Sequence, residues 1–114
     1  MVGHLTDAER TFGYRAFCVS RGDRTLLPGF DEQAYVEGSQ YADQRLASLV
    51  DEFGVVRDGN LAMLRRLDAP RLAIVGTANG TPISVRARLY IMAGHVRHHL
   101  ELLRERYGVG VARE

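Results

Sequence analysis

The sequence predicts an all-α fold, a small bundle built around three long helices. Apolar residues recur at steps of three and four over residues 4–19, 42–67 and 82–107, which is the spacing of one helix face. Breaks rich in glycine, proline and aspartate separate these segments. No stretch shows the strict alternation of apolar and polar residues that indicates a half-buried strand. At 114 residues, the chain is expected to form a single domain over residues 1–114.

Composition and charge narrow the classes of function. The net charge is +1, and the 15 basic residues, all arginine, are scattered, so no basic patch for nucleic acid or a membrane surface is expected. Neither a signal-peptide core nor a bilayer-spanning apolar run is present in the sequence. The single cysteine, Cys18, excludes an internal disulfide, and its apolar neighbours favour a buried hydrophobe. We therefore expect a cytoplasmic protein without nucleic-acid or membrane partners.

The first helix is predicted over about residues 4–19. Its apolar face consists of Leu5, Ala8, Phe12, Ala16 and Val19. A polar, glycine-containing break at residues 20–24 ends this helix, and residues 27–31 (Leu-Pro-Gly-Phe-Asp) give a turn signal. Residues 31–39 predict only a short helical turn.

The second helix is predicted over residues 42–67. Its apolar stripe consists of Leu46, Leu49, Val50, Phe53, Val56, Asn60, Leu61, Leu64 and Leu67. Asp68-Ala69-Pro70 ends the helix. Residues 71–80 are expected to be a connector that packs Leu72, Ile74 and Val75 against the bundle.

The last helix has a clear start signal. Thr81 can cap it, and Pro82 suits its first position, where a missing N–H costs nothing. The predicted buried face consists of Val85, Leu89, Met92, Val96, Leu100, Leu103 and Tyr107. Gly108 and Gly110 are expected to end the helix.

Four glycines, Gly13, Gly54, Gly59 and Gly94, fall inside the predicted helices. Each costs roughly 0.5–1 kcal/mol relative to alanine in a helix interior. Gly94 directly precedes His95, and two explanations stay open for it. It could admit a neighbouring helix or a ligand close to a metal, or it could serve tight packing between helices.

Three of the four histidines gather in the segment Gly94-His95-Val96-Arg97-His98-His99. His95 and His99 are four residues apart, so both imidazoles can reach one metal ion from the same side of a helix, whereas His98 points toward solvent. The pair alone is a weak signal, and partly buried or solvated histidines are its alternative. If the first and last helices are neighbours, His4 would complete a three-nitrogen site with an open position.

Acidic residues follow the histidine pair on the same helix. Glu101 and Glu105 could orient the histidines from behind. We favour a solvated face, in which these carboxylates pair with Arg97, Arg104 and Arg106.

Three segments resemble the DinB-like superfamily, in the same order over nearly the whole chain. These are His4-Leu5-Thr6-Asp7-Ala8-Glu9-Arg10, Leu27-Pro28-Gly29-Phe30-Asp31, and Ser84-Val85-Arg86-Ala87 followed by residues 94–99. The resemblance implies an up-and-down four-helix bundle that binds a divalent metal through one histidine of its second helix and a His-x-x-x-His pair of its last helix. The ligands implied here are His4, His95 and His99.

One departure concerns the family's first helix, because the sequence starts essentially at the first histidine. The expected bundle therefore has three main helices and an open apolar side, which would seek a partner. The recorded start could lie downstream of the true one, which we favour. Alternatively, a symmetric partner chain supplies the helix, or the chain is a shortened variant. We expect the purified chain to be a homo-oligomer, most simply a dimer.

The resemblance implies a metal-dependent enzyme, either a thiol-dependent S-transferase that uses a low-molecular-weight thiol or a hydrolase acting on a small molecule. Zinc or nickel suits three nitrogen ligands, and manganese or iron becomes suitable if a carboxylate or extra waters join. No general base is evident beside the histidines. The alternative is a non-catalytic helical interaction or dimerisation module with a vestigial or structural metal site.

Overall fold

The computed structural model describes the backbone of residues 1–107 and the side chains of residues 1–101. Within this range the chain forms helices and one small hairpin, so the predicted all-α bundle is confirmed. The elements are α1 (Val2–Ser20), α2 (Glu32–Glu37), the 3₁₀ turn η1 (Tyr41–Asp43), α3 (Leu46–Leu64), α4 (Ala69–Leu72), β1 (Val75–Ala78), β2 (Thr81–Ser84) and α5 (Val85–Tyr107). The predicted stop at Gly108 and Gly110 lies outside the described residues.

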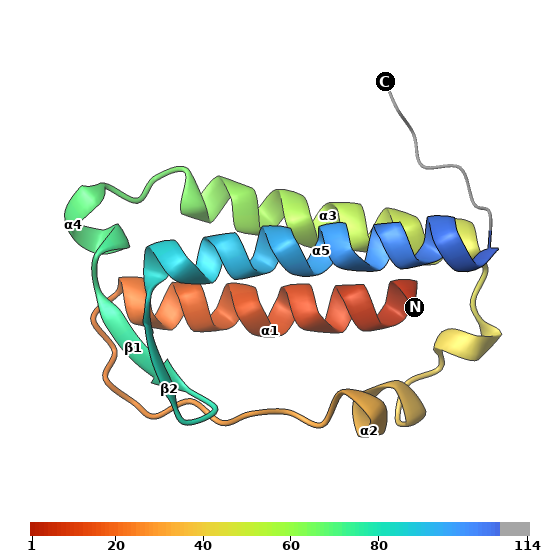
Figure 1. Cartoon of the computed structure of the whole chain (residues 1–114), viewed down its shortest axis with the longest axis horizontal. Helices are drawn as coiled ribbons and strands as arrows, with labels where there is room; N and C mark the ends of the chain where they lie inside the picture. The colour runs from red at the N-terminus through yellow and green to blue at the C-terminus, as the bar shows by residue number, and fades with distance from the viewer. Residues whose placement is uncertain (108–114) are drawn as a thin grey trace.

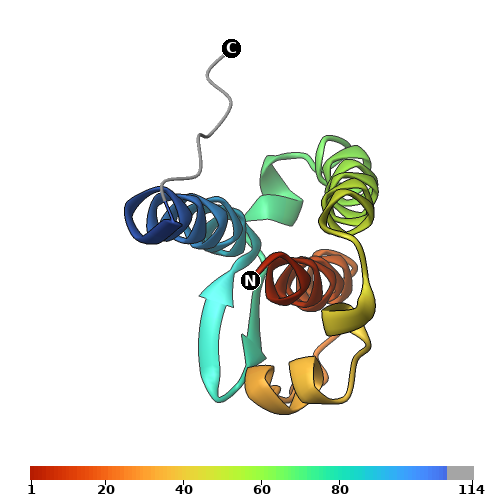
Figure 2. The same cartoon turned by 90° about the vertical axis from the view of Figure 1, so that its right-hand side faces the viewer.

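The three long helices lie side by side, with α1 and α3 running in one direction and α5 in the other (Figure 1). Viewed end-on, α1 occupies the middle, with α3 and α5 on two sides and the hairpin and α2 below it (Figure 2). Both α3 and α5 contact α1 along its length. Because α5 runs antiparallel to α1, its C-terminal half lies beside the N-terminal turns of α1.

Helix α1 is the buried centre of the fold, and small residues let its neighbours approach. Gly3, Ala8, Gly13, Ala16 and Ser20 are all buried along it. Its buried hydroxyls bond within the helix, as when Ser20 Oγ donates to the Phe17 carbonyl at 2.9 Å. A buried polar group is costly only when it lacks a hydrogen-bond partner. Because the buried hydroxyls of α1 have partners within the helix, neighbouring elements can cover α1 on several sides.

A buried carboxylate joins α1 to α3. The Glu9 side chain is 2% exposed, and Arg57 Nη2 lies 3.0 Å from its Oε1. Asn60 Nδ2 donates to Glu9 Oε2 at 2.8 Å and to the Glu9 carbonyl at 3.0 Å. Both carboxylate oxygens therefore have partners on α3, and this sets the position of α3 along α1. Asn60, predicted as part of an apolar stripe, acts here through its amide.

The apolar core lies at the end of the bundle remote from His4. It consists of Cys18, Val19, Leu27, Ala78 and Val85, with Leu67, Leu72 and Ile74 packed against it. Cys18 is 5% exposed, which confirms its prediction as a buried hydrophobe. Helices and hairpin are thus joined by apolar packing at one end, which leaves the other end available for polar side chains.

The hairpin corrects the prediction for residues 71–84. β1 and β2 pair antiparallel with Ala78 opposite Thr81, so Asn79-Gly80 is a two-residue loop. Both loop residues have positive φ, 51° and 75°, as the tight turn of a hairpin requires. Thr81 and Pro82 therefore lie in β2 and do not begin a helix. The cap belongs to Ser84, whose Oγ accepts a hydrogen bond from the Ala87 N–H at 3.1 Å.

The predicted turn in residues 31–39 is present as α2, capped by Asp31, whose Oδ1 accepts from the Ala34 N–H at 3.1 Å. The predicted start of the second helix at residue 42 was wrong, because η1 occupies residues 41–43. Tyr41 ties η1 to α1: its hydroxyl donates to Asp7 Oδ1 at 2.6 Å. Burial and this carboxylate raise the pKa of Tyr41 to about 12.

Only part of the apolar stripe predicted for the second helix is covered by other elements. Leu46 and Val50 are exposed, and no α3 residue is fully buried within the described side chains. The reason is that α1 covers one side of α3 only. On α5, Val85 and Met92 are buried as predicted, whereas the side chains of Leu103 and Tyr107 lie outside the described residues. None of the described helices is long and apolar enough to cross a membrane.

The helical glycines divide into two kinds. A Cβ at Gly13 would overlap the amide of Asn60, so this glycine permits the contact with α3. A Cβ at Gly54, Gly59 or Gly94 would meet nothing within 4 Å. Tight helix packing at Gly94 was therefore a wrong explanation, because no described residue of a neighbouring helix lies within 4 Å of such a Cβ.

We predict opposite effects for alanine at two of these glycines. Gly13→Ala should lower the free energy of unfolding by about 1–3 kcal/mol, because the added methyl group displaces Asn60 from Glu9. The matched variant Gly59→Ala should raise it by roughly 0.5–1 kcal/mol through helix propensity alone. Chemical denaturation of both variants measures the difference, and equal stability of the two would contradict the packing described for Gly13.

Candidate metal centre

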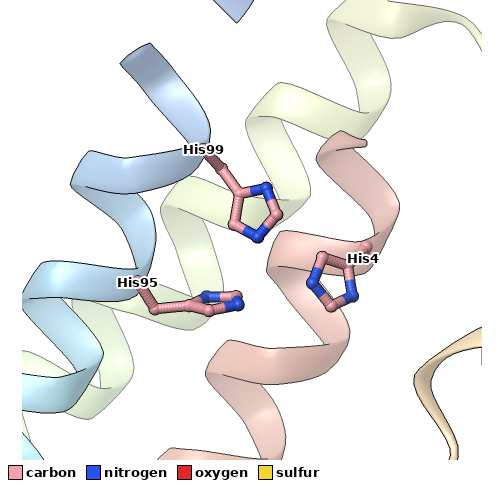
Figure 3. Close-up of side chains that lie close together, drawn as sticks. All are labelled: His4, His95 and His99. Atoms are coloured by element: carbon pink, nitrogen blue, oxygen red, sulfur yellow. The ribbon is translucent and has the colours of Figure 1, made fainter. Parts of the chain in front are cut away.

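Three histidines from two helices converge at the end of the bundle that holds the N-terminus. His4 comes from the first turn of α1, and His95 and His99 come from successive turns of α5 (Figure 3). All three rings point into the space between the two helices (Figure 3). The first and last helices are thus neighbours, which is the condition for His4 to join the pair.

The geometry of the cluster suits a metal ion. One ligand nitrogen from each of the three histidines can be chosen so that all lie within 4.8 Å of one another. The ring centroids of His4 lie 5.2 Å from His95 and 4.9 Å from His99, and those of the pair are 4.5 Å apart. Zinc–nitrogen bonds of about 2.0–2.1 Å place tetrahedral ligands roughly 3.3 Å apart. Small ring rotations therefore suffice, and the three side chains could hold a metal ion.

Electrostatics keep the two α5 histidines in the state that binds metals. Burial, and then the neighbouring imidazole of His4, lower the pKa of His95. Burial, and then His95 and His4, lower the pKa of His99 to about 4. A lowered pKa means that the imidazole is neutral at pH 7, with a lone pair free on one nitrogen. The two α5 histidines therefore need not release a proton before they bind an ion at that pH.

A carboxylate on α2 lies next to the cluster, and no sequence pattern predicts it. Glu32 Oε2 lies 3.9 Å from His4 Nε2, and the Glu32 side chain is half exposed. Together with Phe30, Asp31 and Val36, these two residues line a hollow of about 590 Å³ between α1 and α2. The turn signal before Glu32 predicted a local turn, but not that α2 folds back beside His4.

Other predicted polar groups stay outside the cluster. His98 is exposed, as predicted, and its ring lies 5.4 Å from that of His99. Glu101 is also exposed and forms no ion pair within the described side chains. Glu105, Arg104 and Arg106 lie outside the described side chains. Glu101 is therefore solvated as expected, but the expected ion pair with Arg97 is not formed between these two described side chains.

The side chains of Phe12 and Met1 border the imidazoles. Phe12, two turns after His4 on α1, meets the His95 ring edge to face at 5.5 Å. The Met1 sulfur lies 3.0 Å from His99 Nδ1. The nitrogen donors thus have an apolar wall on one side and the hollow beside His4 on another, an arrangement that suits an ion with both protein and exchangeable ligands.

Comparison with known proteins identifies the family. The family model of the DinB superfamily matches residues 1–103, most of the chain. Searches of curated proteins and of solved structures gave no match. The matched range includes all three clustered histidines. The helical bundle, its His4–His95–His99 cluster and this match agree: the chain belongs to the DinB superfamily.

Proposed function

We propose that this chain is a metal-dependent enzyme in which His4, His95 and His99 hold a divalent ion. The observation that carries the proposal is the convergence of three imidazoles from two helices within 4.8 Å of one another. Zinc or nickel suits three nitrogens, and manganese or iron becomes suitable if Glu32 or waters complete the shell. When bound, such an ion supplies Lewis acidity that lowers the pKa of a water or thiol ligand toward neutrality.

The chain's own residues support two related reactions, transfer of a low-molecular-weight thiol to an electrophilic carbon and hydrolysis. Both need a group that accepts a proton from the incoming nucleophile. Glu32 is placed for this role, because it lines the hollow next to His4 and is half exposed. Phe12 excludes water from the His95 side of the cluster.

The ligand assignment predicts a sharp difference between two adjacent histidines. His99→Ala removes a converging nitrogen and should abolish tight zinc binding, whereas His98→Ala should leave it nearly intact. Elemental analysis after zinc loading and desalting measures this, with about one equivalent expected for the wild type and for His98→Ala. Equal loss in the two variants would contradict the assignment.

The enzyme proposal predicts an activity that depends on metal. Zinc- or nickel-loaded protein should accelerate displacement of chloride from 1-chloro-2,4-dinitrobenzene by a low-molecular-weight thiol, or release of nitrophenol from a nitrophenyl ester. Chelation or His95→Ala should remove this rate, and His98→Ala should retain it. A metal-loaded wild type that accelerates neither reaction with any thiol tested would contradict the proposal.

An apolar groove favours a second candidate function, self-association. It lies between α3 and α5, has a volume of about 290 Å³, and is lined in part by Leu61, Leu64, Leu89, Met92 and Ala93. We propose that a second copy of the chain covers it, because α3 also presents an exposed apolar side chain, Val50, two turns before the groove residue Arg57. On this account the chain acts as a dimerisation module, with or without catalysis.

Self-association predicts that a charge in the groove yields monomers. Ala93 is exposed in the described chain, so Ala93→Glu leaves the fold of one copy intact. Light scattering should give a dimer for the wild type and a monomer for this variant. Ala62→Glu, at an exposed alanine of α3 that does not line the groove, is the control and should stay dimeric. A monomeric wild type with a cooperative thermal transition would refute the dimer.

We also propose a reducing, cytoplasmic setting. The buried free thiol of Cys18 supports it, because free cysteines persist where thiols are kept reduced.

A further inference from the structure

A second cavity lies beside the histidine cluster, between α1, the hairpin and the first turns of α5. Its volume is about 230 Å³. Among the residues that line it are Phe12, Arg15, Asn79, Thr81, Arg88 and Ile91. Two arginines and no carboxylate line the cavity, and the rest of its lining is apolar or uncharged.

Arg88 carries a buried charge without a counterion. It is 5% exposed. One terminal nitrogen, Nη2, donates to the Gly76 carbonyl at 2.7 Å, while Nε is buried and has no hydrogen-bond partner within the described residues. No carboxylate lies within ion-pair distance of Arg88 among the described side chains. An unpaired buried charge is costly. The described residues supply no negative group for Arg88, and a bound anion could supply it.

Arg15 brings a second positive charge to the same cavity. Its Nη2 donates to the Pro28 carbonyl at 2.9 Å, and its guanidinium lies 5.7 Å from the Phe12 ring centroid. Burial lowers the pKa of both arginines, and the charge of Arg15 lowers the pKa of Arg88 further. Burial and mutual repulsion both disfavour the charged form of the two guanidinium groups. An anion bound between them would favour the charged form again.

The cavity adjoins the histidine cluster, and the Phe12 side chain lies between the two. Phe12 lines the cavity and also meets the His95 ring at 5.5 Å. Ile91 lines the cavity one helical turn before His95. Arg88 lies seven residues before His95, which is roughly 10 Å along the helix axis. A molecule whose anionic group binds the arginines would therefore lie next to the histidine cluster, with Phe12 between them.

We propose that this cavity binds the carboxylate or phosphate group of the substrate, with Arg88 as the principal receptor and Arg15 as the second. The planar guanidinium group recognises either oxyanion through paired N–H donors, and both arginines line the cavity. Identifying the substrate as an anion rests on the proposed enzyme function. The anion-binding cavity itself does not depend on metal.

The test is a calorimetric titration of the protein with two probes, inorganic phosphate and succinate, at low ionic strength. Saturable binding of at least one probe is expected, weakened at least tenfold in Arg88→Met and unchanged in Arg86→Met, an exposed arginine of the same helix. Tighter binding of phosphate assigns a phosphate group to the substrate, and tighter binding of succinate assigns a carboxylate. No saturable binding of either probe, or equal binding by Arg88→Met, overturns the proposal.

A second pair of variants keeps the test independent of the fold around Arg88. Thr81 is exposed at the cavity, so Thr81→Glu introduces a competing carboxylate, and Thr81→Gln has nearly the same size without charge. Binding lost with glutamate and kept with glutamine supports the site, and equal binding by the two overturns it.

Metal content is measured on the same samples. Zinc-loaded protein that binds neither probe refutes the anion site alone, whereas anion binding by protein that cannot retain metal refutes the proposed metal function alone.

Discussion

The packing of α1 between α3 and α5 is the constraint on which the rest of the structure depends. A helix buried on several sides must present small residues to its neighbours and satisfy every polar group it buries. Gly13 gives room to Asn60, and Glu9 receives partners on both carboxylate oxygens from α3. With α3 held in this way and α5 antiparallel on the other side, the first turn of α1 has to face the later turns of α5. The position of His4 follows from this arrangement.

The two ends of the bundle hold different kinds of side chain. At one end, the hairpin and the C-terminal turn of α1 enclose the apolar core around Val19 and Val85. At the other end, imidazoles that burial and mutual repulsion keep neutral face one another. Between the two, Arg88 of α5 and Arg15 of α1 bring two positive charges to one cavity, and neither pairs with a carboxylate among the described side chains. The metal site and the anion cavity that we propose would thus form one track, with a substrate anchored at the arginines and reacting near the histidines.

Much of this could be predicted from the sequence, and the remainder could not, for physical reasons. Helical periodicity gave the three long helices and the outward direction of His98. The i, i+4 spacing put His95 and His99 together, but only the fold shows that His4 joins them. Asn79-Gly80 is a typical hairpin loop, but the strands on either side are only four residues each and show no alternation, so periodicity predicts a connector instead. Glu32 and Arg88 gain their importance from elements distant in the sequence, which no local pattern encodes.

The most direct test of the central claim, that α1 and α5 together hold one metal ion, is the X-ray absorption spectrum of the zinc-loaded protein. Its scattering pattern counts the imidazoles around the ion. The account predicts three, with zinc–nitrogen distances of about 2.0–2.1 Å and the remaining positions filled by oxygen. A shell with two imidazoles would mean that His4 is not a ligand and would contradict the account, as would a sulfur scatterer in place of an imidazole.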